Sequence, residues 1–223
     1  MRSATRAAPA ARPVWVVFGL AVAVGSAAVA PYLQLDSNGS RLTVTGELHY
    51  ALLVGHIFTA MVALVLGPLQ FVPAVRAHRR WHRRIGYAYV LAVVPAGVLG
   101  IPVALLSERL LTQVGLLVPA VGWLVTAWLA VRAIRRGDVE AHRSWMARNY
   151  ALTFLAVTAR LLVPLILLAV LAFTGGTLTS LADTVSSFIS VGQVLGWVAN
   201  LAIAEIVIRR RRARTSTTTE ESS

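Results

Sequence analysis

The sequence contains no cysteine and no lysine, and only 9 of its 223 residues are acidic. Without cysteine the chain has no disulfide, no thiolate metal site, no iron–sulfur cluster and no cysteine nucleophile. Charged residues make up 13% of the chain, whereas about 25% is usual for a soluble domain. Because 57% of the residues are hydrophobic, the polar groups cannot cover the apolar surface, and we expect most of the chain to lie in lipid.

Motifs for hydrolytic chemistry are also absent. There is no glycine-rich phosphate loop, no serine nucleophile elbow and no H-E-x-x-H zinc motif. The sequence therefore disfavours a hydrolase and does not decide whether the protein is an enzyme.

Long apolar stretches predict an all-α, polytopic membrane bundle. A helix rises about 1.5 Å per residue, so about 20 apolar residues cross the hydrocarbon layer. Six stretches qualify, at residues 14–30, 50–71, 85–106, 111–131, 150–173 and 188–208. We expect a cytoplasmic N-terminus (1–13), a transmembrane domain (14–208, with a four-helix core over 49–173) and a disordered cytoplasmic tail (209–223).

Every basic residue is arginine, and the arginines are distributed unevenly. Three lie in residues 1–13, five in 72–84, five in 132–149 and five in 209–223. The opposite loops hold only Arg41 and Arg109. The positive-inside rule then places both termini in the cytoplasm, in what we expect is a bacterial inner membrane. The net charge of +12 is thereby assigned to topology and not to nucleic-acid binding.

The first apolar stretch has two interpretations. Its basic start and the Ala28-Val29-Ala30 sequence are also features of a cleavable signal peptide. The stretch is longer than a usual signal-peptide core, and Pro31 would directly follow the cut. We expect an uncleaved membrane anchor, with cleavage as the alternative.

An internal repeat is visible at an offset of 64 residues. His78, Arg79, Trp81 and Arg84 align with a second set, which is His142, Arg143, Trp145 and Arg148. The same offset superimposes the second apolar stretch on the fourth and the third on the fifth. The core is therefore predicted to contain two helical hairpins of the same topology, unless the likeness between two interfacial loops arose by chance.

The histidines are the first candidates for a chemical role. His49 and His56 share one helix face about 10 Å apart, too far to bind the same metal ion. His56 must face the bundle or a cavity, because a polar group in lipid is costly. It is either a core histidine hydrogen-bonded to a neighbouring helix or a carrier of a ligand or proton.

His82 and His142 lie on different helices at the same side of the membrane. If those helices are neighbours, the two imidazoles could hold haem b or a metal ion. The alternative is a pair of interfacial histidines beside arginine. A second haem would need outer histidines on two different helices, but His49 and His56 are on the same helix. A single haem, or one with Met146 as a mixed ligand, agrees with the number of histidines.

Arg160 lies inside the fifth apolar stretch, where a charge costs at least ~2.5 kcal/mol. It should have an inward partner, and Glu205 is the nearest carboxylate by type, although its depth fits poorly. Arg160 either binds an anionic ligand or forms structural hydrogen bonds to backbone carbonyls and polar side chains.

These residues resemble a known family, the bacterial membrane proteins catalogued as domain of unknown function 2306. The resemblance covers about residues 50–165. It rests on His56, Gly67-Pro68-x-Gln70-Phe71, His82-Arg83-x-x-Gly86-x-x-Tyr89, His142-x-x-Trp145-Met146-x-Arg148-Asn149-Tyr150-Ala151-Leu152-Thr153, and Arg160. It implies a multi-pass membrane protein with these histidines and Arg160 as its signature polar groups, and it implies no established activity.

Three functional hypotheses follow. The first is a redox, haem-binding or metal-binding protein, with His82 and His142 as ligands and His56 assisting. The second is a transporter or a binder of lipid or a small anion through Arg160, with Gln70, Tyr89 and Asn149 as further candidate contacts. The third is a structural subunit that contacts membrane lipid, partner subunits or further copies of itself.

Overall fold

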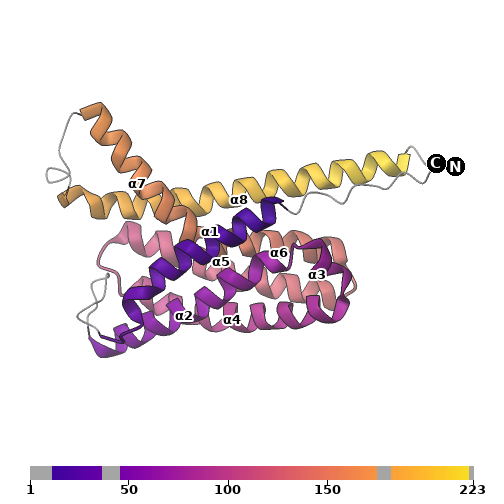
Figure 1. Cartoon of the computed structure of the whole chain (residues 1–223), viewed down its shortest axis with the longest axis horizontal. Helices are drawn as coiled ribbons and strands as arrows, with labels where there is room; N and C mark the ends of the chain where they lie inside the picture. Colours follow the sequence, from indigo (N-terminus) through magenta and orange to yellow (C-terminus); the bar gives the residue numbers. More distant parts are fainter. Residues whose placement is uncertain (1–11, 37–45, 175–181, 221–223) are drawn as a thin grey trace.

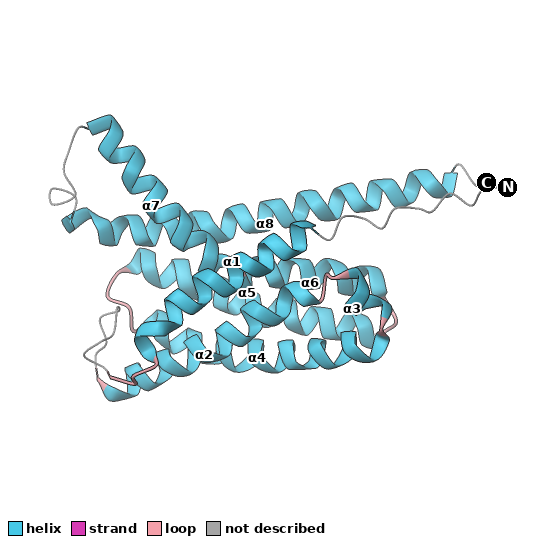
Figure 2. Cartoon of the chain, viewed as in Figure 1, coloured by secondary structure: helices cyan, strands magenta, loops and turns pink. Residues whose placement is uncertain are grey.

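The computed structural model describes residues 12–36, 46–174 and 182–220, and throughout this part of the chain the regular elements are helices (Figure 2). They are α1 (Arg12–Val29), η1 (Ala30–Tyr32), α2 (Glu47–Leu69), α3 (Pro73–Ala77), α4 (Arg79–Leu105), α5 (Leu110–Arg135), α6 (Val139–Thr153), α7 (Leu155–Thr174) and α8 (Ala182–Glu220). Within the described residues, six helices are long and apolar enough to cross a membrane. The predicted all-α bundle with six spans is therefore confirmed, and its outward faces imply contact with lipid.

Helices α2, α4, α5 and α6 form the centre of the bundle, and α1 lies against α2 (Figure 1). Their shared core contains Ala63 from α2, Val93 from α4, Trp123 from α5 and Tyr150 from α6. Small residues permit the close packing of α1, since a side chain at Gly25 would overlap Met61 of α2. The α4–α5 link is short, as predicted, and the two helices pack against each other as an antiparallel pair.

The end of α2 shows how the Gly-Pro motif acts. Pro68 has no N–H, so the carbonyl of Leu64 loses its helical donor. The Tyr150 hydroxyl of α6 donates to that carbonyl at 3.3 Å. Gly67 permits the approach, because a Cβ at this position would lie 2.1 Å from the Tyr150 ring. The motif ends α2 as predicted and joins it to α6.

The fifth apolar stretch is not one helix. It breaks at Phe154, so that α6 stays in the bundle while α7 diverges from it (Figure 1). Asn200 of α8 explains the break, because its amide donates to the carbonyl of Ala151 at 3.0 Å. In a continuous helix that carbonyl would accept from Leu155. A side chain inserted into the helical ladder is a known cause of kinks, and Thr158 completes the joint by donating to Asn200 at 2.9 Å. The fourth core helix is thus α6, and most of the predicted fifth span lies outside the core.

The last helix is longer than the sequence pattern predicts. Gly192 and Gly196 let α8 approach α7, since a Cβ at either position would overlap Val163 or Leu155. This is the small-xxx-small spacing that membrane helices use for close contact. Residues 209–220, which we expected to be disordered, continue α8 beyond the bundle (Figure 1). The remainder of the expected tail (221–223), and residues 1–11, lie outside the described part of the chain.

Candidate functional site

The arginines of five helices (α3, α4, α5, α6 and α8) and of one connection gather at one end of the bundle, here called the arginine-rich end. Its carboxylates within the described residues are Asp138, Glu140 and Glu205. Its arginines are Arg76, Arg79, Arg80, Arg83, Arg84, Arg132, Arg135, Arg136, Arg143, Arg148, Arg209, Arg210, Arg211, Arg212 and Arg214. Positive charge is therefore in large excess there.

Beneath the arginine-rich end lies a buried polar network built from α4, α5 and α6. The Tyr89 hydroxyl, which is fully buried, donates to Asn149 Oδ1 at 2.6 Å and lies 2.8 Å from Thr153 Oγ1. The indole N–H of Trp123 donates to Thr153 at 2.8 Å. The Asn149 amide donates to the Trp123 carbonyl at 2.7 Å and to Thr126 at 2.8 Å. These partners hold the three helices in register, because an unpaired polar group in the core would be costly.

Gln70 and His82 are different, because each carries a buried polar atom without a hydrogen-bond partner among the described residues. These atoms are Gln70 Nε2 and His82 Nδ1. The Gln70 amide lies against α4 at Gly86, where an added Cβ would be 3.5 Å from Gln70 Oε1. His82 is one turn earlier on the same face of α4. Gln70 therefore contacts α4 one helical turn away from the backbone position of His82.

His142 of α6 lies close enough to His82 for the two imidazoles to interact electrostatically. The Nδ1 of His142 is hydrogen-bonded to the Ala130 carbonyl at 2.9 Å, which leaves its Nε2 as the second polar atom of the ring. The two histidines thus lie at the same end of the bundle on α4 and α6, and a ligand shared between them stays a prediction. No group of three or more potential metal-ligating side chains occurs within the described ranges.

Guanidinium groups surround these histidines. Both Arg76 and Arg143 act electrostatically on His82. Burial, together with the charges of Arg143 and Arg211, lowers the pKa of Arg76. Arginine nevertheless keeps its proton in proteins, so these cations repel one another. An anion bound among them would relieve that repulsion.

Arg148 joins α6 to α8 through an ion pair that the sequence did not predict. Its guanidinium donates to both carboxylate oxygens of Glu205 on α8, through Nε and, at 3.1 Å, through Nη2. The same guanidinium lies 4.6 Å from the Trp145 ring centroid. Glu205 is thus paired with Arg148, although the sequence analysis had considered it for Arg160.

His56 and Arg160 form a second polar location, deeper in the bundle. His56 Nδ1 is hydrogen-bonded to the Ala96 carbonyl of α4 at 2.8 Å, and the ring packs against Gly100. Arg160 of α7 donates to the Ala156 carbonyl at 2.8 Å, and it lies within electrostatic range of His56. His56 is thus hydrogen-bonded to a neighbouring helix, and Arg160 is hydrogen-bonded to a backbone carbonyl. His49 lies separately, near the start of α2.

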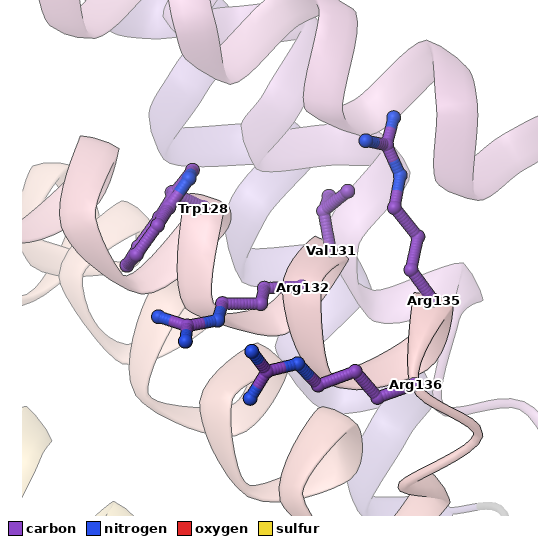
Figure 3. A pocket seen from close by; sticks show the side chains of 5 residues that line it. All are labelled: Trp128, Val131, Arg132, Arg135 and Arg136. Atoms are coloured by element: carbon purple, nitrogen blue, oxygen red, sulfur yellow. The ribbon is translucent and has the colours of Figure 1, made fainter.

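A groove on α5 was not anticipated from the sequence. It has a volume of about 210 Å³ and is lined by Trp128, Val131, Arg132, Arg135 and Arg136. Figure 3 shows the guanidinium groups of Arg132 and Arg136 on the same side of the groove, while that of Arg135 points away from them. The Arg132 guanidinium also lies 5.1 Å from the Trp128 ring centroid.

The fold and these polar clusters define a polytopic helical membrane protein with an arginine-rich end. The family model described as "Predicted membrane protein (DUF2306)" matches residues 53–208. The chain therefore belongs to this family, which confirms the resemblance found in the sequence. The match also includes the second half of α7 and much of α8, which lie beyond the range of the resemblance (50–165). No curated protein and no solved structure matches the chain.

Proposed function

We propose that this protein binds a small oxyanion at the arginine-rich end, between α2, α4 and α6. The observation that carries the proposal is the pair of buried, unused polar atoms, Gln70 Nε2 and His82 Nδ1, near two cationic side chains. A buried donor without a partner costs about 1–3 kcal/mol. An anion accepting hydrogen bonds there would recover that cost.

The chemistry of the surrounding groups matches an oxyanion. The Gln70 amide donates hydrogen bonds, and a protonated imidazole donates from both ring nitrogens. Arg76 and Arg143 add charge without competing acceptors. Hydrogen bonds from charged donors to oxyanions are about twice as strong as neutral ones. This places the anion contact nearer the arginine-rich end than Arg160, the residue first considered for it.

Arg160 and His56 supply a second, deeper station in this proposal. A cationic group inside the membrane is a hallmark of substrate and ion pathways. An anion released from Gln70 and His82 would next meet these two side chains. We therefore extend the proposal from anion binding to anion transport across the membrane. Arg160→Gln should then abolish passage while leaving binding at Gln70 and His82 intact.

The second candidate function is metal or haem binding by His82 and His142. The proximity of two imidazoles on different helices favours it, because neutral imidazole is a common metal ligand. Purification in mild detergent, followed by an absorption spectrum and metal analysis, tests it. A colourless, metal-free preparation from haem-replete cells would exclude this function.

Removing the unused donor tests the anion proposal. Gln70→Leu should weaken sulfate binding about tenfold, the loss expected for a hydrogen bond worth about 1.4 kcal/mol. The same variant should raise the Tm of the sulfate-free protein, because a buried unsatisfied amide is removed. Calorimetric titration and thermal unfolding in detergent give the two readings.

The matched control is Gln113→Leu. Gln113 Nε2 already donates to the Ser107 carbonyl at 2.7 Å, so its loss should lower the Tm and leave sulfate affinity unchanged. If Gln70→Leu lowered the Tm instead, or if sulfate bound equally well, Gln70 would be a structural residue and the anion site would be refuted.

The location of this site follows from the charge bias. We propose that the arginine-rich end faces the cytoplasm of a bacterial cell, so that the ligand is taken from or delivered to that compartment. Positive loops are retained on the cytoplasmic side during membrane insertion.

A further inference from the structure

The groove on α5 is part of a longer stripe along that helix. Residues 128, 131, 132, 135 and 136 follow the i, i+3, i+4 spacing of one helix face. The same face continues away from the arginines through exposed apolar side chains, Val114, Val118, Val121 and Val125. An apolar strip thus runs along the membrane-spanning part of α5 and ends at three arginines.

The order of these side chains along α5 matches the two parts of a phospholipid, an apolar acyl chain followed by a charged headgroup. The exposed valines offer a surface for an acyl chain, and Trp128, 58% exposed, stands at the boundary. Tryptophan prefers this interfacial depth. Arg132 and Arg136 come next, with their guanidinium groups on one side of the groove (Figure 3).

The electrostatics of the groove select an anion. None of its five lining residues is a carboxylate. The C-terminal end of a helix carries about half a negative charge, which disfavours an anion. Three guanidinium groups exceed that partial charge. Trp128 holds the Arg132 guanidinium beside its ring. The Arg132 side chain therefore loses less conformational entropy when a ligand binds.

We propose that this face of α5 is a binding site for one anionic phospholipid, whose phosphate lies between Arg132 and Arg136 and whose acyl chain follows the valine stripe. A phosphate oxygen pair suits the planar guanidinium fork. Basic sites at the cytoplasmic ends of membrane helices recognise lipid headgroups in this way. The site is separate from the one formed by Gln70 and His82, and it does not depend on that proposal.

Native mass spectrometry of the intact protein released from detergent tests the site. Phosphatidylglycerol and phosphatidylcholine with identical acyl chains are titrated separately, and the first dissociation constant is measured for each. The wild-type protein should bind phosphatidylglycerol more tightly. Arg132→Gln together with Arg136→Gln should weaken phosphatidylglycerol binding about thirtyfold, because each surface arginine contributes about fivefold, and should weaken phosphatidylcholine binding less, because the choline cation offsets the charge of its phosphate.

The control removes two exposed arginines from α4 at the same end, Arg80→Gln with Arg83→Gln, and should have little effect. Gln70→Leu should also retain phosphatidylglycerol binding, which separates this site from the first. Inorganic phosphate at millimolar concentration should not displace the lipid, since it lacks the chain that contacts the valines. Equal binding of the two lipids, equal loss in the control pair, or displacement by phosphate would each overturn the proposal.

Discussion

The hydroxyl groups of Tyr89 and Thr153 lie 2.8 Å apart, and the two residues are separated by 64 positions. That separation is the offset of the sequence repeat, so each residue contacts its own counterpart in the other half. Equivalent residues of two similar halves meet only near the axis that relates the halves. The contact therefore supports the predicted pair of hairpins, with α2 and α4 in one and α5 and α6 in the other.

The Tyr89 hydroxyl should contribute measurably to stability. Tyr89→Phe removes the donor to Asn149 and leaves a buried acceptor without it, which should cost about 1–2 kcal/mol in the free energy of unfolding. Tyr87→Phe is the matched control, because Tyr87 is on the same helix and 68% exposed. Thermal or denaturant unfolding in detergent compares the two, and equal small effects would show that the network is not stabilising.

The ion pair between Arg148 and Glu205 should couple α6 to α8. Their side chains are 20% and 36% exposed, whereas those of Arg212 and Glu140, 3.7 Å apart, are 57% and 50% exposed. A double-mutant cycle should give about 1 kcal/mol for the first pair and a value near zero for the second, since solvent screens exposed pairs. A larger coupling in the exposed pair would contradict this explanation.

Asn200 should determine the direction of α7. Asn200→Leu frees the Ala151 carbonyl to accept from Leu155, so α6 and α7 should become more nearly continuous and the outer end of α7 should approach the bundle. The described chain contains no cysteine, so spin labels can be placed at Leu105→Cys and Phe173→Cys. The inter-label distance should shorten on substitution.

Thr158→Val provides the comparison, because it removes the hydrogen bonds of the Thr158 hydroxyl to Asn200 and to the Phe154 carbonyl and leaves the Asn200 amide on the Ala151 carbonyl. It should shift the distance less than Asn200→Leu. If neither substitution changed the distance distribution, the break at Phe154 would have another cause.

Anion binding at Gln70 and His82 should strengthen as the pH falls. Burial and the nearby His142, Arg76 and Arg143 hold the pKa of His82 below that of a free imidazole, so acidic pH is needed to add the positive charge that favours an anion. Sulfate is the suitable probe because its own charge is constant over this range. Its affinity should rise several-fold as the pH falls from about 8 to about 5. His82→Gln should flatten much of this dependence, and an unchanged pH profile in that variant would remove His82 from the site.

The membrane orientation can be checked with the same cysteine-free background. Glu108→Cys lies between α4 and α5, and Ala77→Cys lies at the arginine-rich end; both positions are exposed. A membrane-impermeant maleimide added to intact cells should label position 108 and should reach position 77 only after permeabilisation. The reverse pattern would invert the proposed orientation.

Composition and length determined the membrane character of this protein, its six spans and the short α4–α5 hairpin. These properties depend on the cost of moving whole segments from water to lipid, which adds up along the chain and is independent of neighbouring helices. The family motif also located the end of α2, but proline alone does not end a helix here, since Pro95 and Pro102 lie inside α4 and Pro119 lies inside α5. The extension of α8 over residues 209–220 was not predicted, because the polar composition of this segment resembles that of disordered tails.

Only the tertiary structure decided which polar groups meet. Glu205 pairs with Arg148, Asn200 breaks the helix at Phe154, and Gln70 lies against α4 at Gly86. Each outcome depends on the rotation and depth of one helix relative to another. That arrangement is fixed by side-chain packing between segments far apart in the sequence, and a periodic pattern within one segment carries no information about it.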